Sequence, residues 1–167
     1  SITGFKVVLY GRDQANQWHL LAGADPSTGA IEEADFDTEG AKISIEYGRP
    51  SLKGRAVGKD VATNGAVWRT GADEATTLKT DKALMFGSVH LPAGTYTLYT
   101  LPGDKAWQLI VNKQTGQWGT EYAQAQDAGR IPMAVGKTKA PVELLTISLD
   151  DTPQGGTLRI EWGGTSA

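Results

Sequence analysis

The segment Lys42-Ile-Ser-Ile-Glu-Tyr47 alternates apolar and polar side chains without a break. Strict alternation with a period of two predicts a half-exposed antiparallel β-strand, with both isoleucines and Tyr47 facing the core. Pro50 has no backbone N–H and restricts the residue before it, so the strand is expected to stop at Gly48. The sequence around Tyr47 therefore indicates a sheet that ends in an irregular loop.

Other segments have a similar length and character. Turn-forming residues separate them, and the chain contains 21 glycines and 7 prolines, which favours many short elements over a few long helices. Only residues 121–128 have a helix-favouring composition. We therefore predict an all-β protein, an antiparallel β-sandwich or jelly roll of about nine short strands with at most one short helix. The main strand candidates are residues 4–10, 17–22, 42–47, 83–86, 94–100, 106–112, 142–149 and 157–162.

Length and charge narrow the class of protein. The 167 residues fit one domain spanning the whole chain, residues 1–167. A net charge of −3 gives no bulk attraction to nucleic acid, and no apolar run approaches the roughly 18 residues that span a bilayer. We expect no nucleic-acid partner and no membrane insertion. The absence of cysteine excludes disulfides and thiolate chemistry.

The least generic residues lie in two motifs, Tyr47-Gly-Arg-Pro-Ser-Leu-Lys-Gly-Arg55 and Trp68-Arg-Thr-Gly-Ala-Asp-Glu-Ala-Thr-Thr77. Guanidinium groups bind carboxylates and phosphates in a bidentate fork. The motifs therefore predict either a pocket for an anion or carbohydrate, or a structural clasp in which arginines pair with acidic residues; we favour the clasp. The residues concerned are Tyr47, Arg49, Lys53, Arg55, Trp68, Arg69, Asp73 and Glu74.

Catalysis has weaker support. A serine nucleophile such as Ser51 would need a histidine beside it, and the chain has only His19 and His90, neither in a recognisable nucleophile turn. Asp73 and Glu74 are adjacent, whereas a glycosidase pair must face one bond from opposite sides. We assign no catalytic residue.

An acidic loop suggests a metal. Asp35, Asp37 and Glu39, followed by Gly40 and then Glu46, reproduce much of the spacing of a calcium loop. The loop leads into a strand instead of a helix, so an EF-hand is disfavoured. A Ca²⁺ site on the first three carboxylates is the only cofactor that we predict, and a solvated acidic loop is the alternative.

Four ordered motifs carry a family resemblance. Besides the two motifs above, they are Leu91-Pro-Ala-Gly-Thr-Tyr96 and Asn112-Lys-Gln-Thr-Gly-Gln-Trp-Gly119. The chain resembles the bacterial domain-of-unknown-function family 2911 over about residues 43–162, with residues 1–40 as an N-terminal elaboration. The resemblance implies an exported β-sandwich and supplies no activity.

Together these features predict a non-catalytic, exported bacterial module with a structural or self-assembling role. A first residue other than methionine fits a removed signal peptide or simple loss of the initiator methionine. The apolar strand at residues 5–9 suggests a homo-oligomer in which one copy completes its neighbour's sheet by strand addition. The alternative is a ligand-binding or hydrolytic site on the cluster Arg49, Arg55, Arg69, Asp73 and Glu74.

Overall fold

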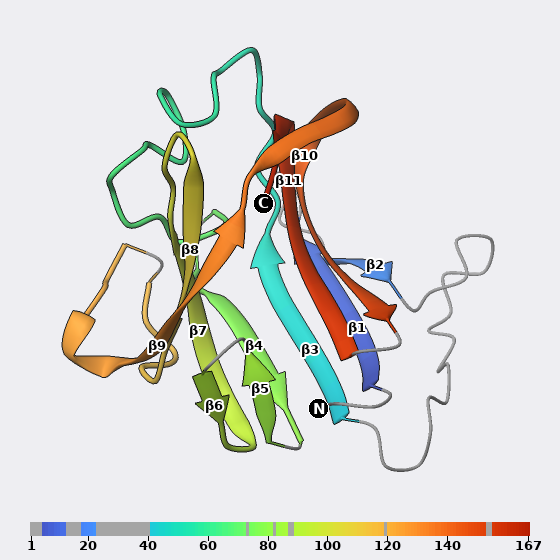
Figure 1. Cartoon of the computed structure of the whole chain (residues 1–167), viewed down its shortest axis with the longest axis vertical. Helices are drawn as coiled ribbons and strands as arrows, with labels where there is room; N and C mark the ends of the chain where they lie inside the picture. The colour runs from blue at the N-terminus through green and yellow to red at the C-terminus, as the bar shows by residue number, and fades with distance from the viewer. Residues whose placement is uncertain are drawn as a thin grey trace.

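In the part of the chain that the structure describes, most residues lie in β-strands (Figure 1). The computed structural model describes residues 5–12, 18–22, 41–72, 74–81, 83–86, 89–118, 120–152 and 155–167. The helical content of these ranges is one 3₁₀ turn, η1 (Gln124–Gln126), which confirms the all-β class. Their strands are β1 (Phe5–Arg12), β2 (Trp18–Ala22), β3 (Ala41–Gly48), β4 (Thr76–Thr80), β5 (Leu84–Phe86), β6 (Val89–Leu91), β7 (Gly94–Leu101), β8 (Ala106–Asn112), β9 (Asp127–Ala134), β10 (Gly136–Thr152) and β11 (Gly155–Ser166).

Seven strands form the main sheet, in the order β2-β1-β3-β4-β7-β8-β9. The pairing of β3 with β4 is antiparallel, as the alternation in residues 42–47 predicts. On its other side β3 pairs with β1 in parallel, from Phe5↔Ala41 to Arg12↔Gly48. A parallel neighbour needs a crossover longer than a hairpin turn. Here β2 lies between β1 and β3 in the chain order.

The long hairpin β10–β11 packs over the main sheet and makes the second layer of the sandwich (Figure 1). Ile43, Ile45 and Tyr47 of β3 share one apolar cluster with Ile147 of β10 and Ile160 of β11. Glu46, on the alternate face of β3, is exposed. The inward and outward residues of this strand are therefore as the sequence predicts.

The segment with helix-favouring composition forms very little helix. Only the turn η1 is helical, and β9 begins immediately after it at Asp127. Gly129 lies inside β9, where a Cβ would stand 2.6 Å from the Val89 side chain. Pairing with β8 and packing against β6 thus override a weak local preference.

Candidate functional site

Tyr47 and Arg49 tie β3 to β10 across the sandwich. The Tyr47 side chain is only 1% exposed, and its hydroxyl accepts a 2.8 Å hydrogen bond from the N–H of Ile147. Arg49 donates from Nε to the Leu145 carbonyl at 2.9 Å and from Nη2 to Thr146 Oγ1 at 3.0 Å. Burial raises the pKa of Tyr47 to about 12, although the Arg49 charge acts in the opposite direction.

Glu143 of β10 fixes the loop that follows Arg49. Its Oε1 accepts hydrogen bonds from the Ser51 hydroxyl at 2.5 Å and from the backbone N–H of Lys53 at 2.8 Å. These two bonds, the first above all, lower the pKa of Glu143. Lys53 has a left-handed backbone (φ 51) and an exposed side chain, so it contributes its N–H and not its ammonium group.

Arg55 closes its own loop. Its Nε donates to the Leu52 carbonyl at 3.0 Å and its Nη2 to the Ser51 carbonyl at 2.8 Å. The residue is exposed, and both acceptors lie within four positions of it. Arg55 therefore acts locally, whereas Arg49 reaches across 96 positions of the chain.

Trp68 belongs to an aromatic group between the layers. Its ring stacks on Trp162 of β11 with centroids 5.6 Å apart and meets Trp107 of β8 edge-on at 6.1 Å. Its backbone also exchanges two hydrogen bonds with Thr100 of β7, at 2.8 and 2.9 Å. Trp68 thus serves as a packing residue that joins the second motif to both layers.

The remaining predicted residues follow Trp68. Arg69 is half-buried and donates from Nε to the Gly71 carbonyl at 3.3 Å. Glu74 is exposed and forms an isolated antiparallel bridge with Trp118. Asp73 lies outside the described residues, as do Asp35, Asp37 and Glu39 of the predicted calcium loop. Among the residues that the structure does describe, no group of three or more His, Asp or Glu side chains is arranged to hold a metal.

The two motifs meet through their glycines. Gly48 lies so close to the backbone of Ala72 that it has no room for a Cβ. At Gly71 a Cβ would be 2.9 Å from Thr76 Oγ1 and 3.1 Å from the Gly48 carbonyl oxygen. The sequence therefore identifies two segments that do come together, and close backbone contact is one of the interactions that hold them.

The described parts of the cluster do not converge on one cavity. The acceptors of Arg49 lie on β10 and those of Arg55 lie in its own loop, while Trp68 is inside the sandwich. The Ser51 hydroxyl donates to a carboxylate instead of a histidine, and His90 is exposed on β6. The described hydrogen bonds of Arg49 and Arg55 go to carbonyl and hydroxyl oxygens of the protein and not to the acidic residues of the predicted clasp. The pairing of arginines with Asp73 and Glu74 stays a prediction.

Sequence reasoning missed a polar network on the outer face of the main sheet. The Asn112 amide, which is buried, donates to the Ala123 carbonyl and to Asp127 Oδ1, both at 2.9 Å. The Tyr122 hydroxyl donates to Asp127 Oδ2 at 2.6 Å, and Arg130 pairs with the same carboxylate at 3.5 Å. These contacts anchor the segment after β8. The available signal in the sequence was an asparagine, Asn112, directly after the apolar run Leu109-Ile-Val111.

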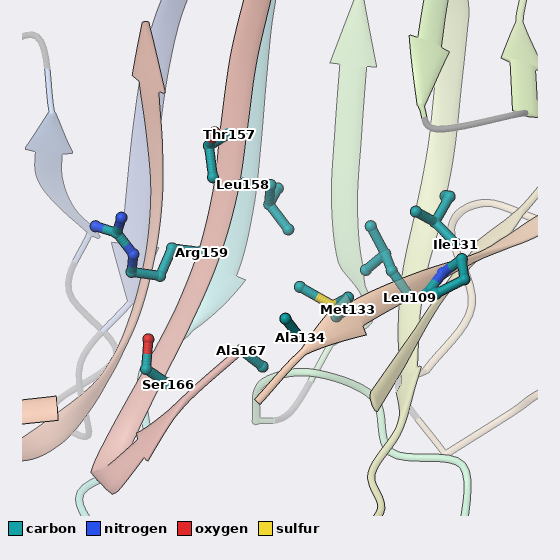
Figure 2. A pocket seen from close by; sticks show the side chains of 10 residues that line it. Leu109, Ile131, Met133, Ala134, Thr157, Leu158, Arg159, Ser166 and Ala167 are labelled. Atoms are coloured by element: carbon teal, nitrogen blue, oxygen red, sulfur yellow. The ribbon is translucent and has the colours of Figure 1, made fainter. Parts of the chain in front are cut away.

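A groove of about 410 Å³, lined by apolar residues and by Thr157, Arg159 and Ser166, lies between β9 and β11 (Figure 2). Leu109, Ile131 and Met133 line it from the main sheet, and Leu158 lines it from β11. Ala167 closes one end. None of the predicted site residues that the structure describes lines this groove. Apolar positions of a strand look alike in sequence whether they are covered or open, so the sequence does not reveal the groove.

A known protein family matches most of the chain. The family described as "Protein of unknown function (DUF2911)" matches residues 30–167, which contain β3 to β11 and leave out β1 and β2. The match begins at residue 30, inside the segment 1–40 that contains none of the four motifs. No curated protein and no solved structure matches the chain. By its motifs and by this match over most of its length, the chain belongs to the DUF2911 family.

Proposed function

We propose that this protein is a non-catalytic structural module that self-associates by exchanging its N-terminal strands between copies. The observation that carries the proposal is the position of β1. This strand lies outside the family match and pairs with β3 of the family region over eight residues, in parallel. An added pair of strands therefore covers one edge of the shared fold.

The backbone hydrogen bonds between β1 and β3 would be the same if β1 came from another copy of the chain. Without β1, the β3 edge would present a row of unpaired N–H and C=O groups, which is a template for a strand from another copy. Residues 23–40 connect β2 to β3, and 18 extended residues reach at most about 60 Å. The β1–β2 pair can thus reach a neighbour, and mutual exchange gives a closed dimer.

The arginine cluster supports the non-catalytic part of the proposal. A ligand-binding or hydrolytic site needs guanidinium groups that face a cavity, and Arg49 and Arg55 donate to backbone and hydroxyl oxygens of the protein itself. Export rests on the family resemblance alone. Fractionation of cells expressing the complete gene product tests it: recovery with the cytosolic proteins would contradict export.

Strand exchange is testable because the chain has no cysteine. Val8 and Ser44 are register partners in β1 and β3, so the variant Val8→Cys/Ser44→Cys links whichever copies contribute the two strands. We expect a covalent dimer on a non-reducing gel and a dimer by light scattering. The matched control is Glu46→Cys/Thr77→Cys, a register pair of β3 and β4, which should link within one chain.

A crosslink confined to single chains at Val8 and Ser44, with a monomer by light scattering at every concentration, would overturn the proposal. If neither variant crosslinks, free-thiol labelling decides whether the sulfurs are buried. After reduction of the crosslinked Val8→Cys/Ser44→Cys dimer, the protein should still elute as a dimer, because strand exchange does not depend on the disulfide.

A further inference from the structure

Another pocket, of about 520 Å³, lies between the first part of β10 and the outer face of β11. Ile160 and Trp162 of β11 are buried, so Arg159 and Glu161, which alternate with them, point away from the core. Figure 2 shows Arg159 on the side of β11 opposite to Leu158. We call this pocket the basic pocket. Its described lining residues are Lys137, Thr138, Lys139, Ala140, Val142, Arg159, Glu161 and Ser166.

The basic pocket lies where β10 leaves its register with β11. Lys137 pairs with Thr165 and Val142 pairs with Gly163, so five steps along β10 match only two along β11. Extra residues bend a strand away from its partner. In Figure 1 the first part of β10 bends sharply before the strand runs alongside β11. Two hydrogen bonds fix this bend: Thr138 Oγ1 donates to the Gly163 carbonyl at 3.2 Å, and Trp162 Nε1 donates to the Glu143 carbonyl at 3.0 Å.

Positive charge dominates the basic pocket. Its described lining contains three basic side chains and one acidic side chain, and thus a net charge of +2, whereas the whole chain has a net charge of −3. Lys137 and Lys139 are exposed, and neither pairs with an acidic residue that the structure describes. A pocket lined mainly by one sign of charge concentrates ions of the opposite sign. The pocket therefore favours an anion.

The acidic side chain adds a requirement that a simple anion does not meet. Glu161 is half-buried, and an ionised carboxylate accepts hydrogen bonds but donates none. Hydroxyl groups of a ligand satisfy it, whereas a bare anion only repels it. The half-buried Ser166 hydroxyl can donate to or accept from the same ligand. The volume of the pocket also falls within the range of small-molecule sites, about 300–1,000 Å³.

We propose that the basic pocket binds a small acidic sugar, a monosaccharide with a carboxylate or phosphate group. The acid group lies between Lys137 and Lys139, whose ammonium groups bind either kind of anion as point charges. The sugar hydroxyls donate to Glu161, and the ring packs on Ala140 and Val142. This site is separate from the β1–β3 edge and does not depend on strand exchange.

Titration of the isotope-labelled full chain, followed by amide NMR at constant ionic strength, tests the site. The probes are D-glucuronate and D-glucose 6-phosphate. We expect saturable shifts at residues 137–142 and at Glu161 with at least one of them, and none with uncharged D-glucose. The tighter of the two identifies the acid group. Each sugar that binds should do so more tightly than acetate or inorganic phosphate, the simple ion with its acid group, because only the sugar offers hydroxyls to Glu161.

Variants separate this site from general attraction between charges. Lys137→Gln/Lys139→Gln should weaken binding of the acidic sugar by about tenfold or more. The matched control Lys105→Gln/Lys113→Gln removes two exposed lysine charges elsewhere and should leave the affinity nearly unchanged. Glu161→Ala should reduce the preference for the sugar over the simple ion, since both share the acid group and only the sugar loses an acceptor.

All four lysines are exposed, so both double variants should keep the wild-type midpoint of urea unfolding, and a loss of binding is then not a loss of fold. Failure of both acidic sugars to bind would refute the site. Equal losses in the two lysine double variants would also refute it, because the sugars would then respond only to overall charge. A sugar bound no more tightly than its simple ion would contradict the assignment of a sugar.

Discussion

The Tyr47 hydroxyl accepts a hydrogen bond from the N–H of Ile147, 100 positions further along the chain. Both residues are almost completely buried, so the bond joins β3 to β10 inside the sandwich. Through this bond, the tyrosine of the first family motif attaches the second layer to the main sheet.

Replacing Tyr47 with phenylalanine should destabilise the protein by about 1–3 kcal/mol, because a buried N–H at Ile147 loses its acceptor. Urea unfolding followed by tryptophan fluorescence measures the change. The control is Tyr96→Phe, whose hydroxyl donates to the Pro92 carbonyl only four residues away. Equal losses in both variants would show that the Tyr47 bond has no special role in joining the layers.

Alkaline pH should unfold the protein progressively. Burial raises the pKa of Tyr47 to about 12 from 10.0, so the folded state holds this proton more tightly than the unfolded chain. The free energy of unfolding therefore falls as pH rises from about 10 to about 12. Burial also raises the pKa of Tyr99 and Tyr122, which adds to the same trend. Unfolding free energies in that pH window should show a shallower slope for Tyr47→Phe.

The three arginines of the clasp should differ in their effect on stability. Arg49→Ala removes two charge-assisted hydrogen bonds to β10 and should lower the free energy of unfolding by about 1.5–3 kcal/mol. Arg55→Ala removes bonds within an exposed loop and should change it by at most about 0.5 kcal/mol. Arg69→Ala removes a hydrogen bond to the Gly71 carbonyl, and its effect on the free energy of unfolding should lie between those of the other two variants. If Arg49→Ala is as mild as Arg55→Ala, the arginine is available for a ligand after all.

The Glu143 carboxyl should titrate below its ordinary range. The Ser51 hydroxyl and the Lys53 N–H bind its charged form and lower its pKa. Its stabilising contribution is thus present above the unfolded pKa and is lost as pH falls through the folded one. Carbon-detected NMR titration should show this pKa rising in Ser51→Ala. An unchanged pKa would mean that the hydroxyl does not bind the carboxylate in solution.

Calcium is a prediction from sequence alone, since Asp35, Asp37 and Glu39 lie outside the described residues. If the loop binds the ion, isothermal titration should give heat with the wild type and none with Asp37→Ala. Asp104→Ala, at an exposed aspartate elsewhere, is the matched control. Absence of heat from the wild type would leave the segment as a solvated acidic loop.

The local pattern of side chains was sufficient to predict individual strands and to identify the two motifs. The alternation at residues 42–47 predicts which side chains of β3 are buried, and the glycines of the two motifs lie where the motifs touch. The short helix that residues 121–128 suggested is the 3₁₀ turn η1, and it ends before Asp127 because the residues that follow pair with β8, with Gly129 close to Val89. The sequence also did not predict that Glu143 binds the first motif. Glu143 has no distinctive sequence context, and only the fold brings it to Ser51.

The sequence by itself determined that this is an all-β chain of its family and which faces of its clearest strands are buried, because side-chain alternation is a property of each strand alone. Only the tertiary structure decided what the motif residues bind. Hydrogen bonds across about 90 to 100 positions, such as those of Tyr47 and Arg49, depend on how the layers stack.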